Sequence, residues 1–317
     1  NAVFVCHALT GDAHAAGDGG WWDTLIGPGR ALDTDRYFVV SPNLLGGCRG
    51  TTGPLSTDPA TGRAYGLDFP LFSMADLVAV HRRLLAHLGI QRLQGAIGGS
   101  LGGMQVLQWA IDAPEEIERA VLVCASSRLS AQNIAFSAVA RDAIMRDPDF
   151  LDGRYPDTFS GTARRPDRGL AVARRMAHIT YVSDESLEAK FGRDRVAEGP
   201  PRMGTDFEVE SYLDHQAEIF LARFDALSYL YLTRVMDYFD PFADPDAAAR
   251  ARGANVLVIS FDSDWRFPTP HSRRIHEHLV AAGVASQHVE IGSPWGHDSF
   301  LLQPLGYHQR IASFLAR

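Results

Sequence analysis

The stretch Ala96-Ile97-Gly98-Gly99-Ser100-Leu101-Gly102-Gly103-Met104 decides the fold prediction. It contains the pattern G-x-S-x-G, with apolar residues before it that are typical of a buried strand and apolar residues at helical spacing after it. A serine on a tight turn between a strand and a helix projects its hydroxyl out of the backbone. The flanking glycines allow strand and helix to pack closely around that turn. The pattern also occurs in ordinary loops, so Ser100 is a nucleophile candidate only if an acid and a histidine follow in the right order.

Short apolar runs alternate with helical patterns on both sides of this turn. The expected strands are Ala2–Cys6, Tyr37–Ser41, Leu93–Ile97, Ala120–Ala125, Val256–Phe261 and His288–Ile291. The expected helices between them are Met74–Leu88, Leu101–Ile111 and Arg273–Ala282. Such alternation predicts an α/β fold with a mostly parallel sheet and helices on both faces. In such sheets the active site lies at the carboxyl ends of the strands.

The alternation stops between about residues 128 and 245. This segment contains no convincing strand, and its helical stretches are Asn133–Met145, Gly169–His178 and Ser211–Leu232. Because it stands between two expected strands, we expect residues 128–245 to form an inserted helical lid. The catalytic core would then comprise residues 1–127 and 246–317.

Composition excludes several classes of protein. The 317 residues are 46% hydrophobic and 21% charged, as in a soluble globular protein, and the net charge of −8 argues against a nucleic-acid partner. No apolar run is long enough to span a membrane, and no signal peptide is visible. The 3 cysteines fit a reducing compartment such as the cytoplasm, with Cys6 and Cys124 in the core, and no Cys/His spacing indicates a metal site. The chain begins at Asn1 inside a strand-like run, so we expect the natural chain to start earlier.

An acid and a histidine do follow Ser100 in the order that this architecture requires. A serine hydroxyl needs a base to take its proton and an acid to orient that base. Asp262 and Asp264 come directly after the fifth expected strand, and His297 follows the sixth. Each residue alone fits a turn, a helix cap or the surface; together they match the order Ser, acid, His. We therefore predict a triad of Ser100, Asp264 and His297, preferring Asp264 to Asp262 because it lies further past the strand end.

An acyl-transfer site also needs backbone N–H groups that stabilise the oxyanion of a tetrahedral intermediate. One is expected from Leu101, the residue after the nucleophile. The other is expected from the loop His7–Asp12 after the first strand, where Leu9 is the candidate.

Six segments carry a longer pattern. They are HALTGDAH (His7–His14), GWWD (Gly20–Asp23), NLLGGCRGTTGP (Asn43–Pro54), GGSLGGMQ (Gly98–Gln105), RRMAHITY (Arg174–Tyr181) and GHDSFL (Gly296–Leu301). Together they resemble the homoserine O-acetyltransferase family, whose members are acyltransferases with the α/β-hydrolase fold. The match runs from the first residues to the end of the chain, so the resemblance implies that fold for the whole chain.

The resemblance also implies an activity. Ser100 would take the acetyl group of acetyl-CoA and pass it to the γ-hydroxyl of L-homoserine in a ping-pong reaction, giving O-acetyl-L-homoserine for methionine biosynthesis. Acetyl-CoA is then a co-substrate, and no bound cofactor is implied. A homodimer through the lid helices is implied as well.

Three substrate contacts follow from the same resemblance. Arg174 would bind the substrate carboxylate and Asp298 its ammonium group, with Tyr181 nearby. An arginine fork suits a carboxylate, but the doubled arginine leaves Arg175 as an alternative.

Other readings share these motifs. A succinyl donor or L-serine as acceptor would use the same triad, and so would an esterase that transfers the acyl group to water. The acid after His297 and the arginine in the lid favour an amino-acid acceptor over water. A non-catalytic binding module would be expected to show a damaged triad, and all three positions are intact.

Overall fold

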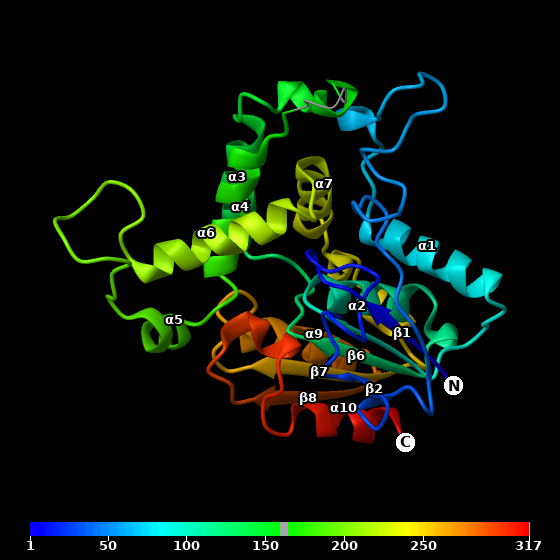
Figure 1. Ribbon diagram of the computed structural model, residues 1–317. Helices are drawn as coiled ribbons and strands as arrows, with labels where there is room; N and C mark the ends of the chain where they lie inside the picture. The colour runs from blue at the N-terminus through cyan, green and yellow to red at the C-terminus, as the bar shows by residue number, and fades with distance from the viewer. Residues whose placement is uncertain (159–163, 317) are drawn as a thin grey trace. The chain divides into compact units, whose positions relative to one another are not determined.

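The computed structural model describes residues 1–158 and 164–316, which form two compact units (Figure 1). The first unit comprises Asn1–Leu45, Phe72–Leu129 and Arg234–Arg317, and the second comprises Gly46–Leu71 and Ser130–Thr233. This division differs from the expected core and lid at two places. Gly46–Leu71 belongs to the helical unit, and the chain returns to the sheet unit at Arg234 rather than at residue 246.

The first unit is built on a six-stranded parallel sheet with the strand order β4-β1-β5-β6-β7-β8. The strands are β1 (Ala2–Cys6), β4 (Phe38–Val40), β5 (Gly95–Gly99), β6 (Arg119–Val123), β7 (Asn255–Phe261) and β8 (Ala285–Ile291). Every residue of β1, β5 and β6 is buried, which explains why these strands are apolar throughout except for Arg119 at the start of β6. The predicted α/β class with a parallel sheet is confirmed. A separate parallel pair joins β2 (Ile26–Gly27) to β3 (Leu32–Asp33).

Helices cover both faces of this sheet (Figure 1). The helical elements of the unit are α1 (Met74–His87), α2 (Leu101–Asp112), η2 (Pro114–Glu116), η5 (Pro241–Ala243), α8 (Ala247–Arg250), α9 (Thr269–Ala281), η6 (Gly296–Leu301) and α10 (Tyr307–Leu315). On one face Phe4 packs edge-on against Trp109 of α2, with ring centroids 5.0 Å apart. On the other face α10 and the segment around Trp22 share a core with Val5 and Ile97.

The second unit is helical. Its elements are η1 (Gly66–Asp68), α3 (Ala131–Met145), η3 (Leu151–Gly153), η4 (Tyr155–Thr158), α4 (Asp167–Ile179), α5 (Asp184–Phe191), α6 (Glu208–Leu221) and most of α7 (Ala226–Asp237). Gly46–Leu71 joins this unit through Tyr231, whose hydroxyl donates to the carbonyl oxygens of Leu67 at 3.0 Å and Phe69 at 2.6 Å. No helix in the described ranges is both long and apolar enough to cross a membrane.

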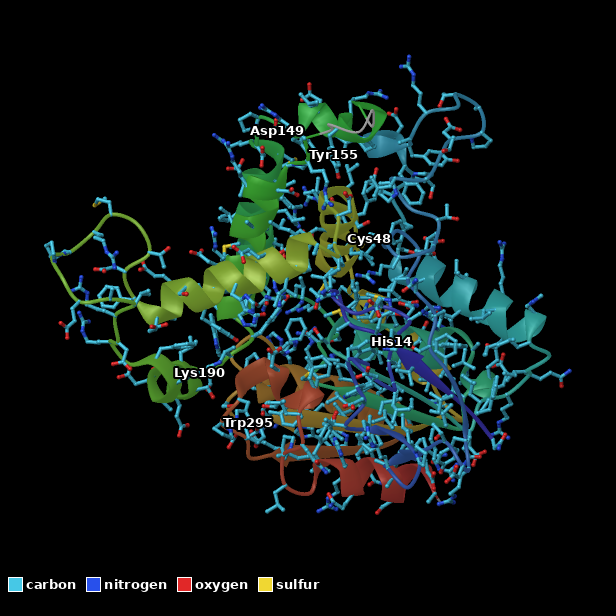
Figure 2. All side chains as sticks on the ribbon, in the orientation of Figure 1. His14, Cys48, Asp149, Tyr155, Lys190 and Trp295 are labelled. Carbon is cyan, nitrogen blue, oxygen red and sulfur yellow. The ribbon has the colours of Figure 1, made fainter. Side chains whose placement is uncertain are left out.

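The prediction of one continuous helix over Ser211–Leu232 is wrong. The first helix ends at Leu221 and the next begins at Ala226. The carboxylate of Asp225 accepts the backbone N–H of Leu227 at 2.9 Å, so it caps the start of the second helix. The same carboxylate accepts the hydroxyl of Tyr155, labelled in Figure 2, at 2.8 Å. This tertiary contact fixes the break, and helical periodicity alone could not reveal it.

Candidate active site

Ser100 occupies a strained turn between β5 and α2. Its backbone lies at φ 57° and ψ −123°, which a residue with a side chain rarely adopts. The neighbouring glycines are required by space: a Cβ on Gly98 would lie 2.3 Å from the backbone of Gly102, and a Cβ on Gly102 would lie 2.1 Å from the carbonyl oxygen of Cys6. Leu101 begins α2, so its N–H is among the backbone donors that a helix leaves free at its N-terminus. These donors favour negative charge beside Ser100.

Asp264 and His297 are in direct contact. The Nδ1 atom of His297 lies 2.7 Å from Oδ2 of Asp264, and both residues are buried. The other oxygen of Asp264 accepts the backbone N–H groups of Arg266 at 3.0 Å and Phe267 at 2.9 Å. These two bonds fix the carboxylate, which in turn orients the imidazole. Asp298 follows His297 in η6 and is partly exposed.

Asp262, the alternative acid, bonds the backbone near His297 and not the histidine side chain. Its Oδ1 accepts the backbone N–H of Ser293 at 2.9 Å. The hydroxyl of its neighbour Ser263 accepts the N–H of Gly296 at 3.0 Å and donates to the carbonyl oxygen of Ser293. Asp262 and Ser263 therefore tie the loop after β7 to the segment that carries His297, while Asp264 bonds the histidine itself.

Cys124 borders this group and directly follows β6, the strand between those that lead to Ser100 and Asp264. The Sγ of Cys124, a carboxylate oxygen of Asp264 and a ring nitrogen of His297 all lie within 4.8 Å of one another. This combination of residue types could hold a metal ion. Burial raises the pKa of the Cys124 thiol well above its ordinary value, and the Asp264 carboxylate adds to this effect, so the thiol is protonated. The core burial predicted for this cysteine is confirmed. Its contact with the acid and the base left no sign in the sequence.

The loop that carries Leu9 is held by contacts from several segments. The carbonyl oxygen of Ala8 accepts the N–H of Gly11 at 3.0 Å, and Trp21 donates its indole N–H to the carbonyl oxygen of Asp12 at 2.8 Å. The next residue, Trp22, donates to the carbonyl oxygen of Phe300, at 2.8 Å, in the segment that carries His297. The paired tryptophans therefore support both the Leu9 loop and the histidine segment. No pattern in the sequence predicted these contacts for either tryptophan.

The two candidate arginines differ in the second unit. Arg175 forms an ion pair with Asp214 at 2.7 Å, and its side chain is 40% exposed. Arg174 is buried; its guanidinium lies over the rings of Tyr181 at 5.7 Å and Phe220 at 5.0 Å. Its hydrogen bond to Gln216 is long, at 3.5 Å, and its buried Nε has no hydrogen-bond partner among the described residues. The Nε of Arg175 likewise has no partner among those residues, so the two arginines differ in burial and in the ion pair. Within the described part of the chain Arg174 has no carboxylate partner, which makes it the better candidate to bind one.

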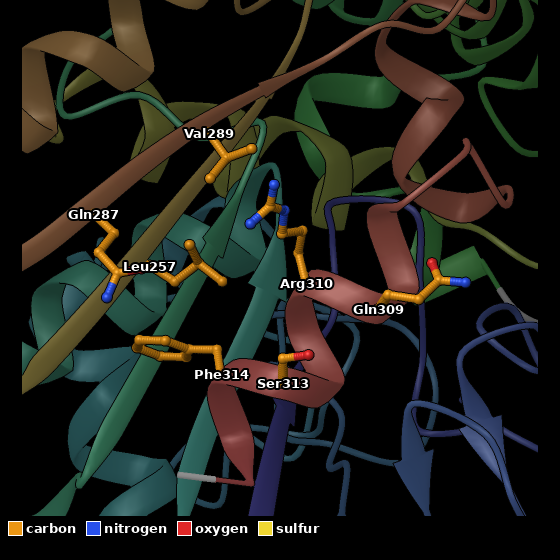
Figure 3. Close-up of a pocket in the computed structure, with 7 residues that line it drawn as sticks. All are labelled: Leu257, Gln287, Val289, Gln309, Arg310, Ser313 and Phe314. Atoms are coloured by element: carbon orange, nitrogen blue, oxygen red, sulfur yellow. The ribbon is translucent and has the colours of Figure 1, made fainter.

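The pocket drawn in Figure 3 is not this site. It lies between the edge strand β8, strand β7 and helix α10, and it is lined by Leu257, Gln287, Val289, Gln309, Arg310, Ser313 and Phe314. None of these is a predicted site residue.

Comparison with known proteins agrees with the fold and places the chain among acyltransferases. Residues 1–304 match the family described as alpha/beta hydrolase fold. A homoserine O-succinyltransferase of a Nocardioides species is 64% identical over 324 residues, which cover 99% of this chain and 87% of that protein. A homoserine O-acetyltransferase of Rhodospirillum rubrum is 51% identical over 327 residues, which cover 99% and 83%.

Two crystal structures are similar over nearly the whole chain. Homoserine O-acetyltransferase from Bacillus anthracis superposes with a TM-score of 0.91 at 28% identity, covering 100% of this chain and 88% of that one. Esterase E22 superposes with a TM-score of 0.89 at 28% identity, covering 99% and 89%.

Proposed function

This chain belongs to the homoserine O-acyltransferase family of the α/β-hydrolase fold, and we propose that it transfers an acyl group from an acyl-CoA to the γ-hydroxyl of L-homoserine. The hydrogen bond between Asp264 and His297 is the observation that carries the proposal. It supports a base that is already oriented, in a unit where Ser100 occupies a strained turn at the N-terminus of α2.

In the first half-reaction Ser100 is the nucleophile. Its Oγ attacks the thioester carbonyl while its proton passes to Nε2 of His297, and Asp264 stabilises the resulting imidazolium. The backbone N–H groups of Leu9 and Leu101 stabilise the oxyanion. The C–S bond then breaks, the leaving thiolate takes the proton from His297, and the acyl group remains on Ser100 as an ester.

In the second half-reaction homoserine resolves the acyl-enzyme. His297 takes the proton of its γ-hydroxyl, whose oxygen attacks the ester carbonyl, and the proton returns to Ser100 as the product leaves. Arg174, beside Tyr181, binds the substrate carboxylate, and Asp298 binds its ammonium group, which sets the hydroxyl within reach of the base. We further propose that the helices of residues 128–245 act as a lid that keeps water from the acyl-enzyme, and that the chain forms a homodimer through them.

Two acyl-CoA thioesters are candidates for the acyl donor. The sequence motifs led to acetyl-CoA and to O-acetyl-L-homoserine as a methionine precursor. The relative at 64% identity is named a succinyltransferase, and this favours succinyl-CoA as a second candidate. Each donor is incubated with homoserine or with serine, and the release of free thiol is followed. Thiol release that requires homoserine supports the transferase, and the faster donor is the substrate.

An esterase is the competing function, because esterase E22 shares the fold at 28% identity. It predicts thiol release at the same rate with and without an amino acid. That result, or full activity in Ser100→Ala, would refute the proposed transfer through an acyl-serine.

A further inference from the structure

His7 is a buried histidine whose tautomer is fixed by its contacts. It follows β1, and its Nε2 accepts the backbone N–H of Leu44 at 3.2 Å. A neutral imidazole with an acceptor at Nε2 carries its proton on Nδ1. That Nδ1–H donates to the carbonyl oxygen of Ala8 at 2.7 Å. Burial lowers the pKa of His7 to about 4, so this neutral tautomer persists at neutral pH.

The bond to Ala8 sets the direction of the Leu9 N–H. The Ala8 carbonyl and the Leu9 N–H belong to one planar trans peptide group, in which they point in opposite directions. The Ala8 oxygen is fixed by two donors, Nδ1 of His7 at 2.7 Å and the N–H of Gly11 at 3.0 Å. The N–H of Leu9 is therefore held on the side of the peptide away from both donors.

A second contact ties this loop to the start of α2. The side-chain amide of Gln105 donates to the carbonyl oxygens of His7 and Leu101, each at 3.1 Å. Its own oxygen accepts Nε2–H of His81 at 2.8 Å. Gln105 thus links the two segments that carry the proposed oxyanion donors. These three side chains are buried, and His81 and Gln105 are joined directly while Gln105 bonds the backbone of His7.

We propose that His7 is a positioning residue for the oxyanion hole, because its Nδ1–H holds the Ala8–Leu9 peptide with the Leu9 N–H directed at the developing oxyanion. This inference rests on the proposed function, in which Leu9 supplies one of the two donors. His7 itself touches no substrate in this role. Without its bond, only the N–H of Gly11 remains of the two donors described above for the Ala8 oxygen, and the peptide can rotate about that single contact.

Two substitutions separate the two bonds of His7. In His7→Asn the side-chain amide nitrogen stands where Nδ1 stood, so a donor to Ala8 remains. In His7→Gln the polar group stands near the position of Nε2, so the contact to Leu44 can persist while the donor to Ala8 is lost. Both variants lose the buried ring, so their stability costs are similar and their activities can be compared directly. His308→Gln removes another buried histidine, on α10, and serves as a control for stability.

Acylation of Ser100 is measured as the burst of p-nitrophenolate from p-nitrophenyl acetate, and thiol release is measured with the acyl-CoA that the wild type prefers. Loss of one oxyanion donor costs about 100- to 1,000-fold in rate, so a misdirected donor in His7→Gln should slow acylation roughly 30-fold or more. His7→Asn and His308→Gln should stay within about 5-fold of the wild type. The substrate KM should change little in His7→Gln, because the oxyanion forms only as the reaction proceeds.

Melting temperatures from circular dichroism show which variants are folded at the assay temperature. Equal acylation in His7→Gln and the wild type would overturn the role of His7, and so would an equal loss in His7→Asn and His7→Gln. A wild-type chain that shows no Ser100-dependent release with either probe would instead refute the proposed function, and the positioning role with it.

Discussion

Replacing Asp264 by asparagine tests the orientation of the base most directly. The buried carboxylate uses one oxygen for the N–H groups of Arg266 and Phe267 and the other for Nδ1 of His297. Asparagine has a single oxygen. That oxygen will remain with the two backbone donors, because an amide NH₂ there would face two N–H groups. The NH₂ group then faces His297, whose Nδ1 must become an acceptor.

This change places the only ring proton of His297 on Nε2, the atom that should accept the proton of Ser100. An equivalent exchange in a serine protease lowers kcat by about 10,000-fold with the geometry retained, which corresponds to about 5.5 kcal/mol in the barrier. Because Asp264 also accepts a hydrogen bond from Nδ1 of the base, we expect a loss of about 1,000- to 10,000-fold in kcat. The homoserine KM should change much less.

The matched control is Asp262→Asn. Asp262 offers Oδ1 to a single backbone N–H, that of Ser293, and an asparagine oxygen can accept the same bond. We expect its kcat to stay within about 5-fold of the wild type, because Asp262 is exposed and asparagine has nearly the same shape as aspartate. Steady-state thiol release with saturating homoserine measures both variants. A kcat for Asp264→Asn within tenfold of the wild type, or equal losses in the two variants, would refute the assignment of the orienting acid.

Three further predictions concern other parts of the molecule. Ser100→Gly and Ser100→Ala should both be inactive. In urea titrations the free energy of unfolding of the glycine variant should exceed that of the alanine variant by about 1–3 kcal/mol, because φ 57° strains any residue with a side chain. Equal free energies of unfolding would contradict this strain. Arg174→Gln should raise the homoserine KM roughly 10- to 100-fold, as a lost charge-assisted contact does, whereas Arg175→Gln loses only an exposed ion pair worth at most ~1 kcal/mol and should leave KM unchanged. Burial lowers the pKa values of His7 and His81 to about 4, so the unfolded chain binds protons that the folded chain does not. The free energy of unfolding should therefore fall between about pH 6.5 and pH 4, by up to about 1.4 kcal/mol per pH unit for each histidine, and His81→Gln should lower that slope by about one proton in urea titrations.

The strands of the sheet, and the order in which the candidate loops follow them, could be predicted because both depend on residues that are close together in the sequence. Strands such as Ala2–Cys6 are buried on both faces and therefore read as unbroken apolar runs. The turn at Ser100 requires glycines at Gly98 and Gly102, since any Cβ there would meet backbone atoms. The choice of Asp264 over Asp262 depended only on distance past the strand end, and the contacts found for the two carboxylates fit that reasoning.

The features that sequence reasoning missed depend on contacts between distant residues. The break before Asp225 depends on Tyr155, 70 residues away. The network of His7, His81 and Gln105 joins a strand end and two helices, and no spacing rule connects their positions. A buried histidine in a sequence looks like any other histidine until its partners are known. In the proposed mechanism such side chains position other groups without reacting, so no motif for chemistry includes them.

The register of the sheet explains how the candidate site residues, although far apart in the chain, come to lie at one edge of the sheet. Cys6 pairs with Gly98, Gly99 with Val123, and Phe261 with Ile291, so the strands that carry the loops of Leu9, Ser100, Cys124, Asp264 and His297 end at nearly the same level. Because each strand is fixed by burial of its apolar side chains, a slip of one residue would turn those side chains to the wrong face. The free energy that holds this register therefore also holds the spacing of the functional loops. Short ties such as those of Asp262, Trp22 and Gln105 then need only to set the final orientation of each group.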